Sequence, residues 1–337
     1  MKHLFLSAVF ALSMVPLTQP AAQETEIVTI GALTFTGDPF DQYWQKFSEN
    51  FAAKNVPDLG IKMLIRGETG PEEALMRAVR RGRVQMAAFT ASGITAAVPE
   101  FDILRAPYLF SSQAEVDYVL DVYMAPLFED LLAEKGLHLI AFSDEGWFNL
   151  YGDTVFNAPE DTHGVRMRAL QSPASQSFLR SIGADMIQLP FSDVFTGLQT
   201  GLISGGETGT MIYAVAGLDA EAPALTLTRH AYSVGVTAAN KPWFDALSGD
   251  HRKILSDSVP PVDVIRSILR AWVLDDLARV EARGVTVHSQ PADQRAVWMA
   301  ATEGSHATLI EGIGGEAQAL YDAVLEAKRV FANQTSR

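Results

Sequence analysis

The 337-residue sequence contains no cysteine, so disulfide bonds, thiolate metal sites and cysteine nucleophiles are excluded. Positive charge is scarce: 26 Lys and Arg stand against 40 Asp and Glu, for a net charge of −14. A field of that sign repels phosphate backbones and anionic lipids, so we expect no nucleic-acid partner. An anionic ligand would therefore need positive charge supplied locally, at its own site.

Long hydrophobic runs are absent except at the N-terminus, where the stretch 4–15 is almost continuously apolar behind Lys2. About twelve apolar residues are too few to span a bilayer, so we interpret residues 1–22 as a secretory signal peptide; a membrane anchor or a buried first helix is the alternative. We place the mature start near Gln23. Removing one Lys and no acidic residue changes the net charge from −14 to −15. A cysteine-free exported protein suits a bacterial periplasm.

Catalytic and metal-binding motifs are absent. The sequence has no HExxH, GxxxxGK[ST] or GxSxG pattern, and its seven histidines are scattered without metal-ligand spacing. We therefore expect no enzymatic activity, no cofactor and no metal ion. A periplasmic enzyme that uses an α/β cleft remains the alternative, although no nucleophile, base or metal constellation supports it.

Strand and helix patterns alternate along the chain. In the first 150 residues we predict strands over 26–33, 61–65, 84–89 and 137–142, separated by helices that begin at 39, 72 and 112. This order predicts a largely parallel sheet with helices on both faces. The second half shows the same alternation of strands and helices. We predict strands over 165–170, 226–239 and 285–288 and helices over 174–182, 192–200, 262–283 and the remainder to 331.

The predicted fold class is α/β with two lobes, each a mostly parallel sheet flanked by helices. Residues 23–150 form the first lobe, which a later strand completes, and residues 151–250 form the second lobe. Residues 251–337 supply a long bracing helix and C-terminal helices that pack across both lobes. Ligand sites in such folds lie at the carboxyl ends of strands, so we expect the site in the cleft between the lobes.

One basic pair lies on a predicted strand. Arg166 and Arg168 are two residues apart, so both guanidinium groups leave the same face of the sheet. Arg168 is at the carboxyl end of the strand, where open α/β folds place ligands. A guanidinium there can hold a carboxylate through two parallel hydrogen bonds, which a lysine cannot. We predict an anion-binding role for Arg168; a structural ion pair is the alternative.

Three segments carry a specific combination of motifs. Residues 162–208 read THGVRMRALQSPASQSFLRSIGADMIQLPFSDVFTGLQTGLISGGET, and residues 67–110 read GETGPEEALMRAVRRGRVQMAAFTASGITAAVPEFDILRAPYLF. Residues 226–247 read TLTRHAYSVGVTAANKPWFDAL. The first resembles the pattern LkGlKiRvp…GanPvpmpfsEvYtALqtGvvDGqEnp of the periplasmic solute-binding proteins of TRAP transporters (the DctP-like family). The other two segments resemble the same family, so the resemblance covers nearly the whole mature chain.

The resemblance implies a venus-flytrap protein whose two lobes close over a carboxylate ligand and deliver it to the permease subunits of a TRAP transporter. Arg168 stands at the position of the family's arginine that forms a salt bridge with the ligand carboxylate. Phe191 stands at the position of the aromatic residue that packs on the ligand. After Glu207 the family usually has an asparagine that hydrogen-bonds the carboxylate, and here Thr208 takes that place.

The chain departs from the family in the segment after Gly146. Members often carry a second arginine there, whereas this chain reads Trp147-Phe148-Asn149. A second ligand carboxylate therefore lacks its usual partner. Trp147 and Tyr232 are candidates to wall the cleft, with a place in the core as the alternative.

The resemblance also points to two groups of polar contacts from the first lobe. One is the turn over residues 67–70, in which Glu68 stands where the family often has glutamine. As a carboxylate it would favour a ligand hydroxyl or amine and repel a second acid group; a solvated turn residue is the alternative. The other group follows the third strand and offers Thr90 and Ser92.

We therefore expect a monomeric periplasmic receptor that binds a small organic acid without covalent chemistry. The alternatives are the receptor of an ABC-type importer and a periplasmic enzyme. The ligand should carry one protein-held carboxylate, as in a hydroxy acid, a keto acid or a zwitterion. A plain dicarboxylate would require a further cation in the cleft, for which Arg66 and Arg105 are the candidates.

Overall fold

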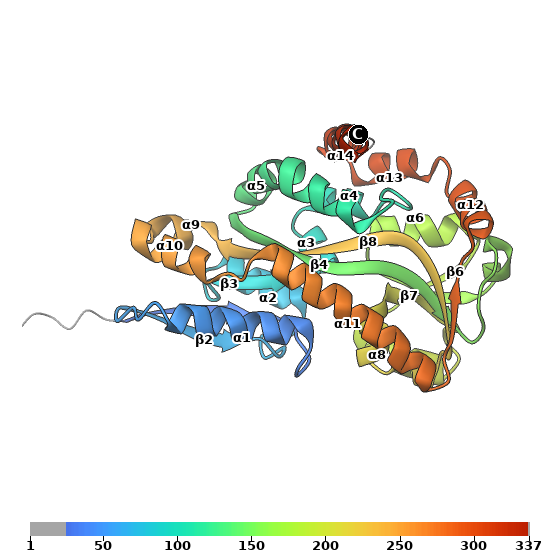
Figure 1. The fold of residues 1–337 in the computed structure, drawn as a ribbon, viewed down its shortest axis with the longest axis horizontal. Coiled ribbons are helices and arrows are strands. Elements are labelled where there is room, and N and C mark those ends of the chain that lie inside the picture. Colours follow the sequence, from blue (N-terminus) through green and yellow to red (C-terminus); the bar gives the residue numbers. More distant parts are fainter. Residues whose placement is uncertain (1–24, 336–337) are drawn as a thin grey trace, which may run out of the picture.

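A mixed sheet of nine strands runs through the described part of the molecule (Figure 1). The structure is a computed structural model that describes residues 25–335, so the predicted signal peptide and mature start lie outside the described residues. The strands are β1 (Glu26–Gly31), β2 (Leu59–Leu64), β3 (Met86–Phe89), β4 (Leu137–Gly152), β5 (Arg166–Ala169), β6 (Asp185–Gln188), β7 (Gly205–Gly209), β8 (Ala224–Asn240) and β9 (Thr286–Ser289).

Helices of very different length surround the sheet. Those of nine or more residues are α1 (Pro39–Ala52), α2 (Glu72–Arg80), α5 (Ala125–Glu134), α6 (Pro173–Ser181), α10 (Gly249–Ser258), α11 (Val262–Ala282), α12 (Ala292–Ala301), α13 (Ser305–Ile313) and α14 (Ala317–Thr335). The shorter α-helices are α3 (Ala91–Thr95), α4 (Gln113–Tyr118), α7 (Val194–Gln199), α8 (Thr210–Val215) and α9 (Lys241–Ala246). The 3₁₀ helices are η1 (Pro99–Arg105), η3 (Pro159–Thr162), η4 (Phe191–Asp193) and η5 (Leu218–Ala220), and η2 (Val119–Met124) is a π-helical segment. Among the described residues, no helix has the length and hydropathy needed to span a membrane.

The two longest strands, β4 and β8, form a spine that both lobes share. They pair antiparallel from Leu137 opposite Asn240 to Gly152 opposite Ala224. At one end of this spine β3 joins β8 and continues to β1 and β2. At the other end β7 joins β4 and continues to β5 and β6, while β9 joins β8. The strand predicted over 137–142 thus runs ten residues further, and the chain passes between the lobes inside a strand.

The sheet is mixed, which refines the prediction of mostly parallel lobes. Within the first lobe β1 pairs parallel with β2 and β3, and within the second β5 pairs parallel with β6 and β7. The antiparallel pairs all involve β4 or β8. These two strands carry the chain across the molecule in opposite directions, so their mutual pairing is antiparallel.

The predicted bracing helix is α11, which crosses in front of β4 and β8 in Figure 1. It contacts α1 of the first lobe and α8 and β9 of the second lobe. Arg270 anchors it to the first lobe through Asp117 at 2.6 Å and Asp144 at 3.1 Å. Arg266 forms a further ion pair with Asp121, at 2.7 Å. Paired charges of this kind fix the position of a long helix on the lobe beneath it.

The helix predicted over 112–134 is helical throughout, but its middle is the π-helical segment η2. Pro126 follows this segment at the start of α5. Proline has no N–H and its ring crowds the carbonyl one turn earlier, so the preceding turn widens.

The aromatic stripe on α1 divides between core and cavity. Trp44, Phe47 and Phe51 lie on one face of the helix and are buried against the sheet. Phe40 and Tyr43 are only half-buried and line a cavity instead. The first turn of α1 therefore contributes to the inner surface of the first lobe.

Candidate ligand-binding site

Arg168 lies near the end of β5 and makes no ion pair with any described carboxylate. Its Nε donates a hydrogen bond to the carbonyl oxygen of Leu189 at 3.2 Å. Its Cζ lies 5.9 Å from the centroid of the Phe191 ring, within the usual range of a cation–π contact. Burial lowers the pKa of the guanidinium, with Tyr151 and Glu207 opposing that shift. The guanidinium is therefore a desolvated cation without an acidic partner in the described chain.

A glycine beside Arg168 allows the strands to approach closely. Gly206 on β7 pairs with Arg168 on one side and Tyr151 on the other. A Cβ at Gly206 would lie 2.6 Å from the Tyr151 hydroxyl oxygen and 3.1 Å from the Cβ of Arg168. Only glycine fits there without moving one of these side chains. The sequence analysis did not predict β7, because a Gly-Gly-Glu-Thr-Gly segment shows no apolar alternation.

Phe191 is 40% exposed in the short helix η4, which follows β6. Phe195, one turn later in α7, is 37% exposed. Phe191 therefore presents an exposed apolar surface next to the Arg168 guanidinium.

Glu207 is buried and paired with His230 rather than directed at a free site. Its Oε2 lies 2.6 Å from His230 Nε2, and the other ring nitrogen lies 2.8 Å from the Thr228 hydroxyl. This network assigns a neutral imidazole that donates Nε2–H to the carboxylate and accepts from Thr228. Burial raises the pKa of Glu207, but the effects of His230, Arg105 and Ser175 together outweigh it, so the net pKa is lowered. The neighbouring Thr208 is also buried.

The predicted first-lobe contacts lie in two separate turns. Thr90 caps α3 and is exposed, and its N–H and hydroxyl both donate to the Glu72 carboxylate at 2.6 Å. Ser92 is half-buried in α3. Glu68 is exposed and accepts a hydrogen bond from the backbone N–H of Arg66 at 2.7 Å. Glu68 thus has the geometry of the solvated turn residue that was the alternative to a ligand contact.

The segment after Gly146 is committed to internal packing. Trp147 and Tyr232 form an edge-to-face pair with 4.8 Å between centroids; Tyr232 belongs to the core of the first lobe, and the half-buried Trp147 packs against it. Asn149 donates to the Trp147 carbonyl oxygen at 3.2 Å and the Thr210 hydroxyl at 3.1 Å, and accepts from Arg229 N–H at 3.1 Å. Phe148 is buried.

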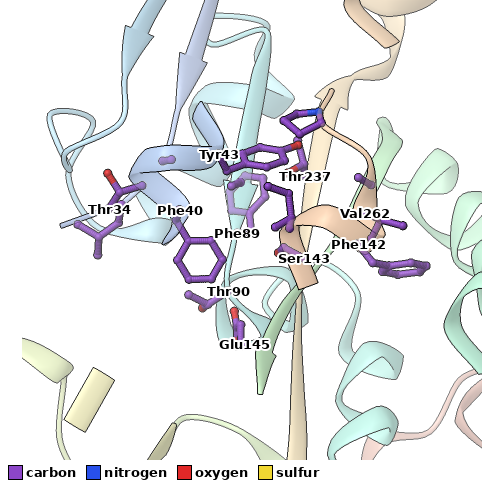
Figure 2. A pocket seen from close by; sticks show the side chains of 16 residues that line it. Thr34, Phe40, Tyr43, Phe89, Thr90, Phe142, Ser143, Glu145, Thr237 and Val262 are labelled. Carbon is purple, nitrogen blue, oxygen red and sulfur yellow. The ribbon is translucent and has the colours of Figure 1, made fainter. Parts of the chain in front are cut away.

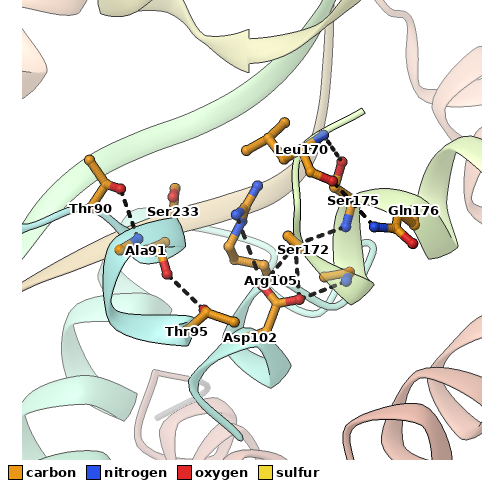
Figure 3. Close-up of polar contacts among 12 residues, drawn as sticks. Thr90, Ala91, Thr95, Asp102, Arg105, Leu170, Ser172, Ser175, Gln176 and Ser233 are labelled. Atoms are coloured by element: carbon orange, nitrogen blue, oxygen red, sulfur yellow. Dashed lines mark hydrogen bonds and ion pairs between the residues drawn. The ribbon is translucent and has the colours of Figure 1, made fainter. Parts of the chain in front are cut away.

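Arg105 is a buried cation that sequence reasoning named only as a fallback. The residue is 2% exposed, and its Nε and Nη1 have no hydrogen-bond partner. Its Cζ lies 4.7 Å from the centroid of Phe148, and Nη1 lies 3.9 Å from an oxygen of Asp102. Figure 3 places the side chain between Ala91 of the first lobe and Ser175 of the second.

Asp102 links the lobes beside this arginine. Its carboxylate accepts from the Ser172 hydroxyl at 2.9 Å and from Ala174 N–H at 2.7 Å, at the start of α6 (Figure 3). Burial raises the pKa of Asp102, and Arg105 opposes that shift. Asp102 therefore partly offsets the charge of Arg105, whereas Arg168 has no carboxylate within ion-pair distance in the described residues.

A cavity in the first lobe was not predicted. Its empty volume is about 660 Å³, including the part open to solvent. Figure 2 shows Phe40, Thr90 and Glu145 on the side of the cavity nearest to the second lobe. The lining residues are Ala32, Leu33, Thr34, Phe40, Tyr43, Ala88, Phe89, Thr90, Ala141, Phe142, Ser143, Glu145, Thr237, Pro260, Val262 and Ile265.

Glu145 is the single acidic residue of that lining. Its carboxylate accepts from the Ser233 hydroxyl at 2.5 Å and from Ala91 N–H at 3.2 Å. Burial raises the pKa of Glu145 to about 7, against the opposing effect of Ser233. The cavity therefore lies in a region that disfavours charge. No group of three potential metal-ligating side chains occurs in the described residues.

Comparisons with known proteins point to one class. Residues 31–312 match the family described as bacterial extracellular solute-binding protein, family 7. The chain is 27% identical over 215 residues to the 2,3-diketo-L-gulonate-binding periplasmic protein YiaO of Escherichia coli, a match that covers 64% of this chain and 66% of YiaO. It is 27% identical over 229 residues to the ectoine-binding periplasmic protein TeaA of Halomonas elongata, covering 66% of each.

Solved structures resemble the whole fold. The sugar acid binding protein DctPAm of Advenella mimigardefordensis, in complex with galactonate, aligns with a TM-score of 0.81 at 25% identity. That alignment covers 90% of this chain and 99% of the other. The same two-lobed arrangement of mixed sheet and helices is thus found in a protein crystallised with an organic acid.

Proposed function

The chain belongs to family 7 of the bacterial extracellular solute-binding proteins, the periplasmic receptors of TRAP transporters, and we propose that it holds one carboxylate of a small organic acid with Arg168. Members of this family bind solutes and are not enzymes. The family membership favours a TRAP receptor over the ABC-type alternative. We also propose that the protein acts as a monomer in the bacterial periplasm and that it delivers the ligand to a TRAP permease.

The proposal rests on the burial of the Arg168 guanidinium and on its lack of an ion pair within the described residues. A guanidinium that is largely removed from water, with Glu207 acting on it only beyond ion-pair distance, is stabilised when a ligand supplies the counter-charge directly. Its planar donor pair matches a carboxylate bidentately, and Phe191 offers an apolar face beside it. A small acid can therefore bring its charge to Arg168 and its carbon skeleton to the aromatic ring.

The charges around the cleft support a ligand with one protein-held carboxylate. Arg66 is bound to Asp41 at 2.7 Å, so it is already neutralised. Arg105 has Asp102 at 3.9 Å and is attracted to buried Glu207 as well. At Arg66 a second carboxylate would thus have to displace Asp41, whereas at Arg105 it would meet two nitrogens without a hydrogen bond in the described residues but would be repelled by Asp102 and Glu207. The ligands named for YiaO, TeaA and DctPAm, a diketo sugar acid, ectoine and galactonate, each contain one carboxylate.

A thermal-shift screen tests the proposal. Wild type and Arg168→Met are titrated with matched acids: lactate, pyruvate, gluconate and ectoine on one side, succinate and malate on the other. We expect the largest stabilisation from an acid with one carboxylate, and none of it in Arg168→Met. If succinate or malate stabilises the protein most, the single-carboxylate argument is wrong and Arg105 must reach the ligand.

A further inference from the structure

The cavity of the first lobe has an aromatic lining. Phe40, Tyr43, Phe89 and Phe142 line it from α1, β3 and β4, and further apolar side chains come from the start of α11. Eleven of its sixteen lining residues are apolar or aromatic. The empty volume of about 660 Å³ includes space that is open to solvent, so the cavity is a partly open pocket.

The polar side chains of the lining are almost all committed to other protein groups. The Thr34 hydroxyl donates to the Ile65 carbonyl oxygen at 3.0 Å, and the Thr90 hydroxyl donates to Glu72 at 2.6 Å. The Tyr43 hydroxyl is hydrogen-bonded to Thr237.

Glu145 is likewise occupied, because it accepts from Ser233 and Ala91. The Ser143 hydroxyl is then the one lining side-chain polar group without a hydrogen bond inside the described residues. A polyhydroxylated ligand would bury several hydroxyl groups here without enough partners.

The electrostatics of the lining agree with this hydrogen-bond inventory. Burial raises the pKa of Tyr43 to about 12 and that of Glu145 to about 7. Both shifts indicate surroundings that solvate charge poorly. An apolar group would lose little on entering such a space and would gain contacts with four aromatic rings.

The cavity faces the second lobe, which carries Arg168. Phe40, Thr90 and Glu145 lie on the side facing the second lobe in Figure 2. Leu33, another lining residue, is 57% exposed. The opening of the cavity is thus on the side from which a ligand held by the second lobe would approach.

We propose that the first-lobe cavity receives an aryl or branched aliphatic body of the ligand, so that the preferred solutes are hydrophobic monocarboxylates and not sugar acids. This inference rests on the proposed function of Arg168 as the carboxylate partner. It divides recognition between the lobes: the second lobe binds the charge, and the first lobe selects the skeleton.

Calorimetry with a matched set of acids tests it. The probes are 3-phenyllactate, gluconate and lactate, each measured against wild type, Ala88→Leu, Ala96→Leu and Arg168→Met. Ala88 lines the cavity, so leucine fills part of it, whereas Ala96 is exposed outside the lining and is the matched control. Phe40→Ala, in the first turn of α1, is a second variant in case leucine at 88 disturbs the sheet.

We expect wild type to bind 3-phenyllactate at least tenfold more tightly than gluconate. Ala88→Leu and Phe40→Ala should each weaken 3-phenyllactate at least tenfold and leave lactate within about twofold, and Ala96→Leu should behave as wild type. Tighter binding of gluconate, with Arg168 required and Ala88→Leu without effect, overturns this inference while the proposed function stands. If Arg168→Met binds every acid as tightly as wild type does, both this inference and the proposed function are wrong.

Discussion

The Arg168 guanidinium lies over the ring of Phe191, with 5.9 Å between Cζ and the ring centroid. The two residues meet because β5 and β6 are parallel neighbours, with Arg168 opposite Ile187 and Phe191 just beyond the end of β6. Carboxyl ends of adjacent parallel strands share one edge of a sheet. A positive charge and an apolar face thereby lie side by side at this edge of the sheet.

Arg168→Lys should impair binding nearly as much as Arg168→Ala. The lysine ammonium is a point charge and cannot reproduce two parallel hydrogen bonds or the planar contact with Phe191. We expect a loss on the order of 2–5 kcal/mol for either variant, as for one partner of a desolvated charge pair. Calorimetry with the acid that gives the largest thermal shift measures it.

Arg166→Lys is the matched control, because Arg166 is exposed on the same strand. It should retain the wild-type affinity. Near-native affinity in Arg168→Lys would show that a simple positive charge is sufficient.

Gly206→Ala should weaken binding without touching the ligand. The new Cβ would lie 2.6 Å from the Tyr151 hydroxyl oxygen and 3.1 Å from the Arg168 Cβ, so Arg168 must shift. We expect about a tenfold loss of affinity or more, since a small displacement of a bidentate donor disrupts its geometry. Adding Tyr151→Phe removes the nearest atom and should restore part of the loss.

Gly209→Ala is the control on the same strand. Its Cβ would meet its nearest neighbour, the carbonyl oxygen of Glu145, at 3.4 Å, an ordinary contact. If Gly206→Ala and Gly209→Ala bind equally well, crowding beside Arg168 is not what holds its position.

The sequence could predict those parts of the site that lie on strongly patterned elements. The alternation around Arg168 and the strand-end position require only local periodicity. The helices and strands that flank them also follow from apolar spacing. This is why Arg168 and Phe191 could be named together before any coordinates, with the family resemblance adding Phe191.

The rest depends on contacts that no local pattern encodes. β7 is glycine-rich because neighbouring groups approach too closely for side chains, so it lacks a hydrophobic signal. The cavity is assembled from elements as distant in sequence as Ala32 and Ile265. Arg105 stands in an apolar run, and its burial beside Asp102 arises only when η1 packs against α6.

His230→Leu should destabilise the protein in a pH-dependent way. In the wild type the pKa of Glu207 is lowered in the folded state, so its contribution is present above the unfolded pKa and is lost as pH falls through the folded value. Without His230, Arg105 and Ser175 still lower the Glu207 pKa, but burial is the largest effect, so we expect the folded pKa to lie above the unfolded one. Stability of the variant then falls as pH rises, with a loss on the order of 3–5 kcal/mol at pH 8.

Urea denaturation at pH 4 and pH 8 measures this difference. His251→Leu removes a more exposed histidine, 3.3 Å from Asp58, and should change stability little at either pH. An equal loss at both pH values for His230→Leu would mean that packing against Phe178, and not the Glu207 carboxylate, dominates.

Glu145→Gln should stabilise the protein more at pH 8 than at pH 5. Burial raises the folded pKa of Glu145 to about 7, above the unfolded value, so its favourable contribution is complete at low pH and is lost as pH rises through 7. Glutamine stays neutral and avoids that loss, which we place on the order of 1–3 kcal/mol. Thermal unfolding across this pH range checks it, with exposed Glu73→Gln as a control that should leave the profile unchanged.

The lobes should close on the ligand, because neither lobe completes the site alone. The second lobe supplies Arg168 and Phe191, and the first supplies the cavity and Thr90. Apolar side chains on both sides are exposed, with Leu33 at 57% and Phe191 at 40%, and closure around a ligand would remove them from water. Closure would bend β4, β8 and α11, which cross between the lobes, and would shift the contacts that η1 and α13 make with α6. Small-angle scattering should therefore show a smaller radius of gyration at saturating ligand for wild type and no change for Arg168→Met. A wild-type radius that is identical with and without ligand would indicate a rigid pocket, and recognition would then have to be complete within one lobe.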